Sequence, residues 1–376
     1  METKKLNGSN DEDLREAGRI IADGGLVAFP TETVFGLGAN ALDEDAVARV
    51  YEAKGRPSDN PMIVHIARAS DIGQLTRFLS PTIVNLIETF WPGPLTLVVK
   101  KREAVPYRTT GGLETVAVRM PDSPIARAII NYADVPIAAP SANISGRPSP
   151  TSTEDVIADL DGKVDAIVDG PDCRVGIEST VLDVTGEVPT VLRPGIITPE
   201  QIEAAIGKKV ALHPSLLERP DGGGQDPHEA AAGAAQGAAG SADELTRNGE
   251  ADPDDEDGNG PKITSGDFVA RSPGMKYKHY APKADMLIVE GERGDVQKEI
   301  ERLKVLNEGL GNKVGVLLFE EQAFIEAAHD FFARLRDLDR EGVDLILAGA
   351  LSDRNSVGFA VMNRMLKSAG YNIVRV

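Results

Sequence analysis

The chain of 376 residues has one cysteine, Cys173, and five histidines scattered widely along it. A single cysteine excludes an internal disulfide and a zinc site built from several cysteines. The histidines do not show the close spacing typical of metal ligands. We therefore expect neither an oxidising compartment nor a metal held by the protein itself.

Long apolar runs are also absent. No stretch approaches the roughly 18 consecutive apolar residues that a membrane-spanning helix needs. The first residues, METKKLNGSN, do not begin the apolar core of a secretory signal peptide. We expect a cytoplasmic protein with no membrane contact.

The common nucleotide and catalytic motifs are missing as well. The chain has no G-x-x-x-x-G-K-[ST] phosphate loop, no G-x-G-x-x-G dinucleotide turn, no H-E-x-x-H and no G-x-S-x-G. Because these motifs are missing, they do not indicate a particular reaction. At this level the sequence predicts only an α/β protein, with an enzyme as the expected class.

The net charge of −19 is unevenly distributed. Residues 221–260 hold 11 acidic residues and one basic residue, Arg247, so this segment carries −10 and the rest of the chain −9. Its only large aliphatic side chain is Leu245, which is too little apolar area to offset the entropy of folding. We predict a catalytic domain over residues 1–209, a flexible acidic Gly/Ala-rich linker over 210–270, and a lid segment with a C-terminal domain over 271–376.

Apolar runs and helical periodicity alternate on both sides of this linker. The predicted strands are 26–30, 62–67, 95–101, 116–120, 137–139, 166–168, 180–184 and 190–192, then 286–289, 314–319 and 345–347. The predicted helices are 11–23, 43–53, 81–90, 123–132, 153–160 and 199–206, then 296–307, 324–338 and 356–367. The expected helix caps are Asp43, Ser80, Asp122, Ser152 and Thr198. Such alternation predicts an α/β catalytic domain and a small Rossmann-like C-terminal domain.

Polar side chains gather at several predicted strand ends. Residues 29–38, FPTETVFGLG, predict a glycine-rich turn that exposes hydroxyls to a ligand, and a plain tight turn fits the pattern equally well. Residues 54–61, KGRPSDNP, predict an anion-binding loop, against the alternative of solvated surface charges. His65 in the next strand is either a ligand-binding or a core histidine.

Three further stretches repeat this arrangement. Arg119 ends an apolar strand and needs an anionic partner, either a substrate carboxylate or an internal Asp or Glu. Residues 138–143, AAPSAN, let a ligand approach the backbone closely. Ser179 and Arg193 place a hydroxyl and a cation at two more strand ends.

Taken together, these stretches resemble the YrdC family, and specifically its two-domain threonylcarbamoyl-AMP synthases. The similarity covers residues 15–205 and continues at 272–282, SPGMKYKHYAP, and at 359–364, FAVMNR. One departure is Phe35, where many members look to have tyrosine. The resemblance implies a twisted α/β sheet with a concave basic cavity.

The resemblance also implies substrates and residue roles. L-threonine would be bound by Thr33, His65, Arg119, Ala139 and Ser179. ATP would be bound by Arg56, Asn60, Thr115, Ser141, Ser149, Arg193 and Tyr277, with Lys54 and Arg56 in catalytic roles and the Tyr277 segment as a lid. Mg²⁺ is expected to accompany ATP, and bicarbonate or CO2 would be the third substrate. The product would pass to a tRNA threonylcarbamoyltransferase.

Two alternatives remain at this point. A hydrogenase-maturation carbamoyltransferase of the same family would carry zinc-finger cysteines, whereas this chain has only Cys173. An RNA-binding translation regulator would use the basic cavity for RNA contact, but it needs an exposed basic face that spans many phosphates. The negative charge and the polar pattern favour a small ligand.

Overall fold

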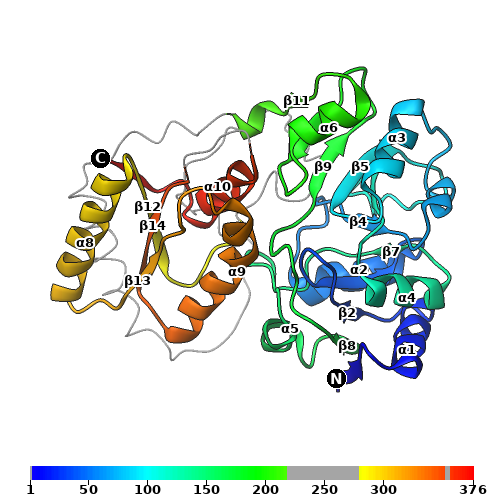
Figure 1. Ribbon diagram of the computed structural model, residues 1–376. Helices are drawn as coiled ribbons and strands as arrows, with labels where there is room; N and C mark the ends of the chain where they lie inside the picture. Colours follow the sequence, from blue (N-terminus) through cyan, green and yellow to red (C-terminus); the bar gives the residue numbers. More distant parts are fainter. Residues whose placement is uncertain (1, 218–278, 352–355) are drawn as a thin grey trace, which may run out of the picture.

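The computed structural model describes residues 2–217, 279–351 and 356–376, which form two α/β units (Figure 1). The helices of the N-terminal unit are α1 (Asp11–Ala22), α2 (Glu44–Lys54), α3 (Pro81–Phe90), α4 (Pro124–Ala133), α5 (Thr153–Leu160) and α6 (Pro199–Ile206), with short 3-10 helices η1 (Ala69–Gln74) and η2 (Pro214–Leu216). Its strands are β1 (Lys4–Asn7), β2 (Val27–Phe29), β3 (Gly36–Asn40), β4 (Ile63–His65), β5 (Leu95–Lys100), β6 (Thr115–Arg119), β7 (Ile137–Ala138), β8 (Ala166–Asp169), β9 (Thr180–Asp183), β10 (Thr190–Arg193) and β11 (Ala211–Leu212).

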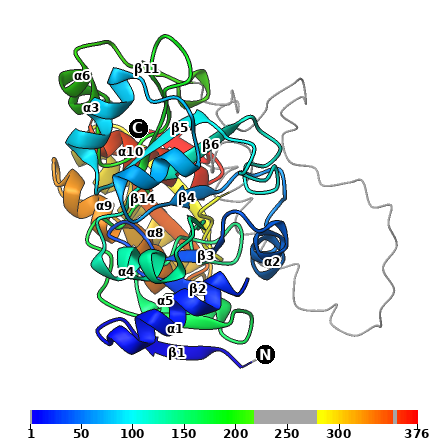
Figure 2. The same ribbon diagram turned by 90° about the vertical axis from the view of Figure 1, so that its right-hand side faces the viewer.

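These strands form one mixed sheet of 11 strands in the order β1-β8-β2-β3-β7-β4-β6-β5-β9-β10-β11. The two views show α1 packed beside α4 at one end of the sheet and α3 beside α6 at the other (Figures 1 and 2). Apolar side chains from the strands and helices form the main core, with Leu37, Val64 and Leu97 completely buried. Each strand and helix predicted before the linker is present.

The predicted glycine-rich turn at Gly36 is wrong, because these residues form β3, which runs antiparallel to β2. A Cβ atom on Gly38 would lie 2.5 Å from the ring of Phe29. The glycine is therefore needed for close packing between the two strands, and the turn lies earlier, between Pro30 and Phe35.

The predicted helix caps were largely placed correctly. The side chains of Asp43, Ser80, Ser152 and Thr198 accept hydrogen bonds from backbone N–H groups in the first turns of their helices. The exception is Asp122, because Ser123 caps α4 instead. Pro124 then occupies the first helical position, where its missing N–H costs nothing.

The C-terminal unit alternates strictly between strands and helices. Its elements are β12 (Asp285–Glu290), α8 (Arg293–Gly309), β13 (Val314–Leu317), α9 (Phe324–Glu341), β14 (Leu345–Gly349), α10 (Val357–Ser368) and β15 (Ile373–Arg375). The four strands are all parallel, in the order β13-β14-β12-β15. This differs from the Rossmann order, since the second and third strands are exchanged. Fully buried β14 takes the inner position, and half-buried β13 takes the edge.

The two units are joined by a shared apolar cluster. Val34, Val175 and Ile177 of the N-terminal unit pack with Phe331 and Phe332 of α9. In Figure 1, α9 and α10 lie on the side that faces the N-terminal unit, and α8 lies on the far side. The pocket described below is therefore built next to this contact.

Within the described residues, the structure differs from the predicted domain limits at one boundary. β11 pairs with β10 beyond the expected boundary at residue 209, so the folded N-terminal unit continues into the segment predicted as linker. Residues 218–270 of that prediction, and Tyr277, lie outside the described residues. Within the described part of the chain, no helix combines the length and apolar character needed to cross a membrane.

Candidate active site

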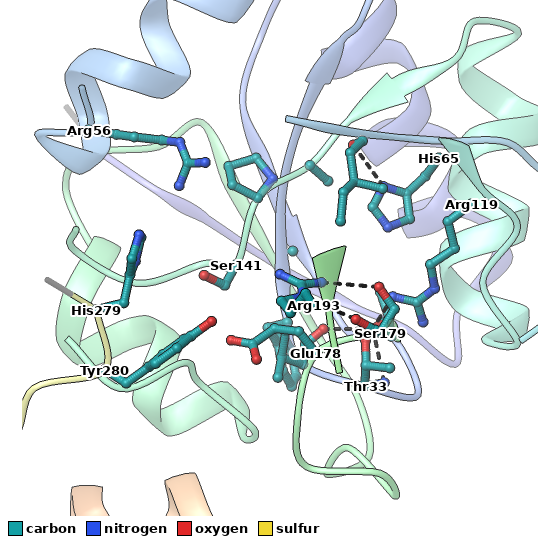
Figure 3. Close-up of a pocket in the computed structure, with 17 residues that line it drawn as sticks. Thr33, Arg56, His65, Arg119, Ser141, Glu178, Ser179, Arg193, His279 and Tyr280 are labelled. Atoms are coloured by element: carbon teal, nitrogen blue, oxygen red, sulfur yellow. Dashed lines mark hydrogen bonds between the residues drawn. The ribbon is translucent and has the colours of Figure 1, made fainter. Parts of the chain in front are cut away.

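A pocket with an empty volume of about 580 Å³ opens at the strand ends of the N-terminal unit and is closed on one side by the C-terminal segment (Figure 3). The lining residues are Thr31, Thr33, Val34, Phe35, Gly36, Arg56, Ile63, His65, Arg119, Ala139, Pro140, Ser141, Glu178, Ser179, Arg193, His279 and Tyr280. Three arginines and one glutamate thus line it, while the basic potential of the whole cavity stays a prediction.

One end of the pocket gathers hydroxyls, an imidazole and a guanidinium. Thr33, His65, Arg119 and Ser179 converge there from the loop after β2, from β4, from β6 and from the loop before β9 (Figure 3). β4 and β6 are parallel neighbours with His65 opposite Arg119, which brings these two side chains to the same edge of the sheet. Ala139, the fifth residue predicted at this end, also lines the pocket.

Arg119 has an internal partner. Its Nη2 lies 2.5 Å from Oε1 of Glu32, and both side chains are buried. Its Nη1 donates to Oγ1 of Thr33 at 2.9 Å, and its Nε donates to the carbonyl oxygen of Gly93 at 3.2 Å. The internal carboxylate that the sequence left open is therefore present, so Arg119 is neutralised before a ligand binds.

His65 is electrically neutral near pH 7. Burial, together with the positive charge of Arg119, lowers the pKa of His65 to about 3. Nδ1 lies 3.2 Å from the carbonyl oxygen of Ile63, which fits a protonated Nδ1. A neutral imidazole suits recognition of a hydroxyl or an ammonium group.

The other end of the pocket holds Arg56 with His279 and Tyr280, and Ser141 and Arg193 lie between the two ends (Figure 3). Arg56 donates from Nη2 to the carbonyl oxygen of Pro61 at 3.0 Å, so the loop after α2 fixes its direction. Burial lowers the pKa of Arg56 to about 10, and the side chain is therefore charged at neutral pH. Arg193 donates from Nη2 to Oγ of Ser179 at 3.2 Å and from Nε to its carbonyl oxygen at 3.1 Å.

Four predicted site residues do not line the pocket. Lys54 is buried, and its Nζ donates to the carbonyl oxygens of Ser141, at 2.6 Å, and Asn143. Burial, followed by the charge of Arg56, lowers the pKa of Lys54 well below its usual value. Lys54 therefore stabilises the 141–143 loop. The position of Lys54 does not support the predicted direct catalytic role.

The other three are Ser149, Asn60 and Thr115. Ser149 donates to Oε1 of Glu178 at 2.6 Å. The backbone carbonyl of Asn60 accepts from the hydroxyl of Tyr51 at 3.1 Å. Thr115 begins β6, opposite Lys100 and at the far end of the strand from Arg119.

Sequence reasoning missed Glu178, His279 and Tyr280 as pocket residues. Glu178 was not assigned to the site, and only the fold shows that it is paired with Arg364 and Ser149. His279 and Tyr280 lie within the stretch 272–282 that carried the family resemblance, next to Tyr277, but no role was assigned to them. The ring of Tyr280 packs on Phe332 with centroids 5.2 Å apart, so α9 fixes its place at the pocket.

Within the described residues, no group of three or more His, Cys, Asp or Glu side chains could hold a metal ion. The two carboxylates nearest the pocket are both engaged, Glu32 by Arg119 and Glu178 by Arg364 and Ser149. These residues fit a divalent cation only if the cation arrives bound to the phosphates of a nucleotide.

The fold and the pocket define a two-domain α/β protein with a site for a small polar molecule and an anion. Comparison with protein families and with known proteins specifies it further. A family model described as "Telomere recombination" matches residues 19–195, and one described as "Threonylcarbamoyl-AMP synthase, C-terminal domain" matches residues 197–370.

Curated relatives agree over the full length. A threonylcarbamoyl-AMP synthase of Pyrococcus abyssi is 43% identical, with 96% of each chain covered. One of Bacillus subtilis is 41% identical over 98% of this chain and 96% of its own. Solved P. abyssi Sua5 complexed with L-threonine is 41% identical, covers 100% of both chains and superposes with a TM-score of 0.82. The chain belongs to the threonylcarbamoyl-AMP synthase family.

Proposed function

We propose that this pocket joins L-threonine, CO2 derived from bicarbonate, and ATP into threonylcarbamoyl-AMP and pyrophosphate. The observation that carries the proposal is the division of the pocket into two ends. Thr33, His65 and Ser179 suit an amino acid at one end, and Arg56 suits phosphates at the other, with Arg193 between them. Family membership and the threonine complex of the P. abyssi relative support the same conclusion.

The reaction requires two bond-forming steps. The deprotonated amine of threonine attacks the carbon of CO2, a C–N bond forms, and a proton leaves to give a carbamate. A carbamate oxygen then attacks the α-phosphorus of ATP, and the bond to the bridging oxygen breaks as pyrophosphate leaves with the electron pair. No protein nucleophile is required, so positioning and charge stabilisation account for the catalysis.

The residues of this chain have corresponding tasks. Neutral His65 and the hydroxyl of Thr33 orient threonine through hydrogen bonds. Neither group carries a charge that would attract the threonine carboxylate. Arg193, which lies between the two ends, faces the point where carbamate oxygen and α-phosphorus meet. Arg56 offsets the charge of the phosphates. Mg²⁺ enters with ATP and, when bound, neutralises phosphate charge.

We further propose that the product is handed to a tRNA threonylcarbamoyltransferase in the cytoplasm. Supporting this, the product is a reactive mixed anhydride that must meet its acceptor soon after release. The proposed lid at Tyr277, together with the ATP contacts of Asn60, Thr115 and Ser149, remains a prediction for the ligand-bound state.

The test is a reaction of the full chain with ATP, Mg²⁺, bicarbonate and L-threonine, followed by mass spectrometry and a parallel pyrophosphate assay. We expect threonylcarbamoyl-AMP and pyrophosphate in equal amounts, and neither when threonine is omitted. If folded protein that binds ATP forms neither threonylcarbamoyl-AMP nor pyrophosphate, the proposal is wrong. Salt-sensitive RNA binding would then be measured as the remaining alternative.

A further inference from the structure

One side chain of the C-terminal unit reaches into the wall of the pocket. Arg364 of α10 is completely buried, although arginine is among the residues least often buried without partners. Its Nε donates to Oε2 of Glu178 at 3.0 Å, and its Nη2 donates to the carbonyl oxygen of Glu178 at 3.2 Å. Its Nη1 donates to the carbonyl oxygens of Pro194 and, at 3.0 Å, Ala360.

The groups that Arg364 binds adjoin the residues that face the ligand. Glu178 lines the pocket and precedes Ser179, and Pro194 follows Arg193. Ser179 and Arg193 are hydrogen-bonded to each other. One guanidinium therefore holds the two chain segments that present the hydroxyl and the cation.

The charge of Glu178 depends on this contact. Burial by itself would raise the pKa of Glu178, but the charges of Arg364 and then Arg193 outweigh it and hold this pKa below its usual value. The second oxygen, Oε1, accepts from Ser149 at 2.6 Å. Both carboxylate oxygens are thus occupied, so Glu178 acts as a fixed part of the wall and not as a base.

We propose that Arg364 is a positioning residue, through which the C-terminal domain sets the geometry of Ser179 and Arg193 at the pocket. Its planar fork bridges Glu178 and Pro194 at once, which the single ammonium of lysine cannot reproduce. The inference deepens the proposed function and rests on it, because the two segments it holds are those assigned to threonine and to ATP.

A second ion pair across the same domain contact provides the matched control. Arg340 of α9 lies 2.7 Å from Asp155, and its side chain is 55% exposed. Neither residue lines the pocket. Arg340→Gln removes a cation from the contact without touching the wall, so it separates weakened domain docking from lost positioning.

The experiment compares full-length Arg364→Gln, Arg364→Lys and Arg340→Gln with wild type. KM and kcat are measured for ATP and for threonine well below each melting temperature, and binding of each substrate is measured by calorimetry. For Arg364→Gln we expect both KM values and both dissociation constants to rise about tenfold or more. Arg364→Lys should fall between Arg364→Gln and wild type, and Arg340→Gln should stay within about twofold of wild type.

The outcomes distinguish this inference from the proposed function. Wild-type substrate constants in Arg364→Gln, or an equal rise in Arg340→Gln, would overturn the positioning role. If Arg364→Gln does not fold, Arg364→Lys decides: substrate constants several-fold above wild type support the role, and unchanged constants refute it. If wild type forms no product, the proposed function fails, and calorimetry on the same variants still tests whether Arg364 shapes the pocket.

Discussion

Each arginine at the pocket has defined partners, and these decide how much positive charge is left for a ligand. Arg119 is ion-paired with Glu32. Arg193 is held by the oxygens of Ser179, and no carboxylate of the described residues forms an ion pair with it. The positive charge of Arg193 is therefore more available to a developing phosphate anion than the positive charge of Arg119.

This difference leads to a prediction for Arg193. Arg193→Met should lower kcat/KM by about 100-fold or more, because removing one preorganised donor to a developing charge typically costs this much. Steady-state pyrophosphate release measures the effect. The control is Arg68→Met, which removes an exposed cation and should leave the rate unchanged. If kcat/KM falls by less than about threefold in Arg193→Met, Arg193 has no role in stabilising the developing charge.

A second prediction concerns pH and His65. Because the pKa of His65 is lowered to about 3 in the folded protein, the unfolded chain binds a proton that the folded chain rejects between about pH 3 and 6.5. The free energy of unfolding should thus rise with pH in this window, by at most about 1.4 kcal/mol per pH unit for this group. His65→Gln should reduce that slope in urea unfolding at several pH values, and an unchanged slope would contradict a neutral His65.

At the scale of elements, the approach of α9 to the N-terminal unit depends on one glycine. Gly176 has φ of +81°, and a Cβ atom there would lie 2.2 Å from the carbonyl oxygen of His329 and 2.5 Å from that of Ala328. Both oxygens belong to α9, whose backbone cannot move without disturbing the shared apolar cluster.

Gly176→Ala should therefore destabilise the contact between the two units. Gly207→Ala is the matched control, because Gly207 also has positive φ, at +65°, and a Cβ atom there meets nothing within 4 Å. Backbone strain at positive φ alone costs about 1–2 kcal/mol, and we expect Gly176→Ala to cost at least about 1 kcal/mol more than Gly207→Ala. Hydrogen exchange of α9 and thermal unfolding measure the difference; equal losses in both variants would show that the close approach is unimportant.

The elements themselves were largely predictable from local pattern. Apolar runs such as 95–100 and capped helices such as α2 carry their own signals. β3 was missed because Gly36 and Gly38 indicate a turn, whereas their purpose is to let strands and a ring pack closely. The short strands β1 and β11 are stabilised by pairing with β8 and β10, which no local pattern reveals.

The site was predictable to a similar extent and for a similar reason. Residues at strand ends, such as Thr33, His65 and Arg193, line the pocket as expected because the strands were predicted correctly, while their roles stay predictions. Lys54 was misplaced, since the direction of a side chain at the end of a helix is set by its acceptors in a distant loop. Glu178 was missed because its partner, Arg364, is 186 residues away.

At the scale of the whole molecule, the two units are parts of one site. The apolar cluster joins them, Tyr280 lines the pocket from the C-terminal segment, and Arg364 holds the wall from α10. In the proposed reaction, the C-terminal domain therefore supports the part of the pocket at which carbamate and α-phosphorus meet. The proposed reaction is an adenylyl transfer whose acceptor is made from threonine and CO2.

Exchange of labelled pyrophosphate into ATP tests this claim most directly, because it reports reversible attack at the α-phosphorus alone. Full-length protein is incubated with ATP, Mg²⁺ and labelled pyrophosphate, with or without threonine and bicarbonate. We expect exchange only when both threonine and bicarbonate are present, and loss of exchange in Arg193→Met. Exchange with ATP alone, or release of orthophosphate instead of pyrophosphate, would contradict it.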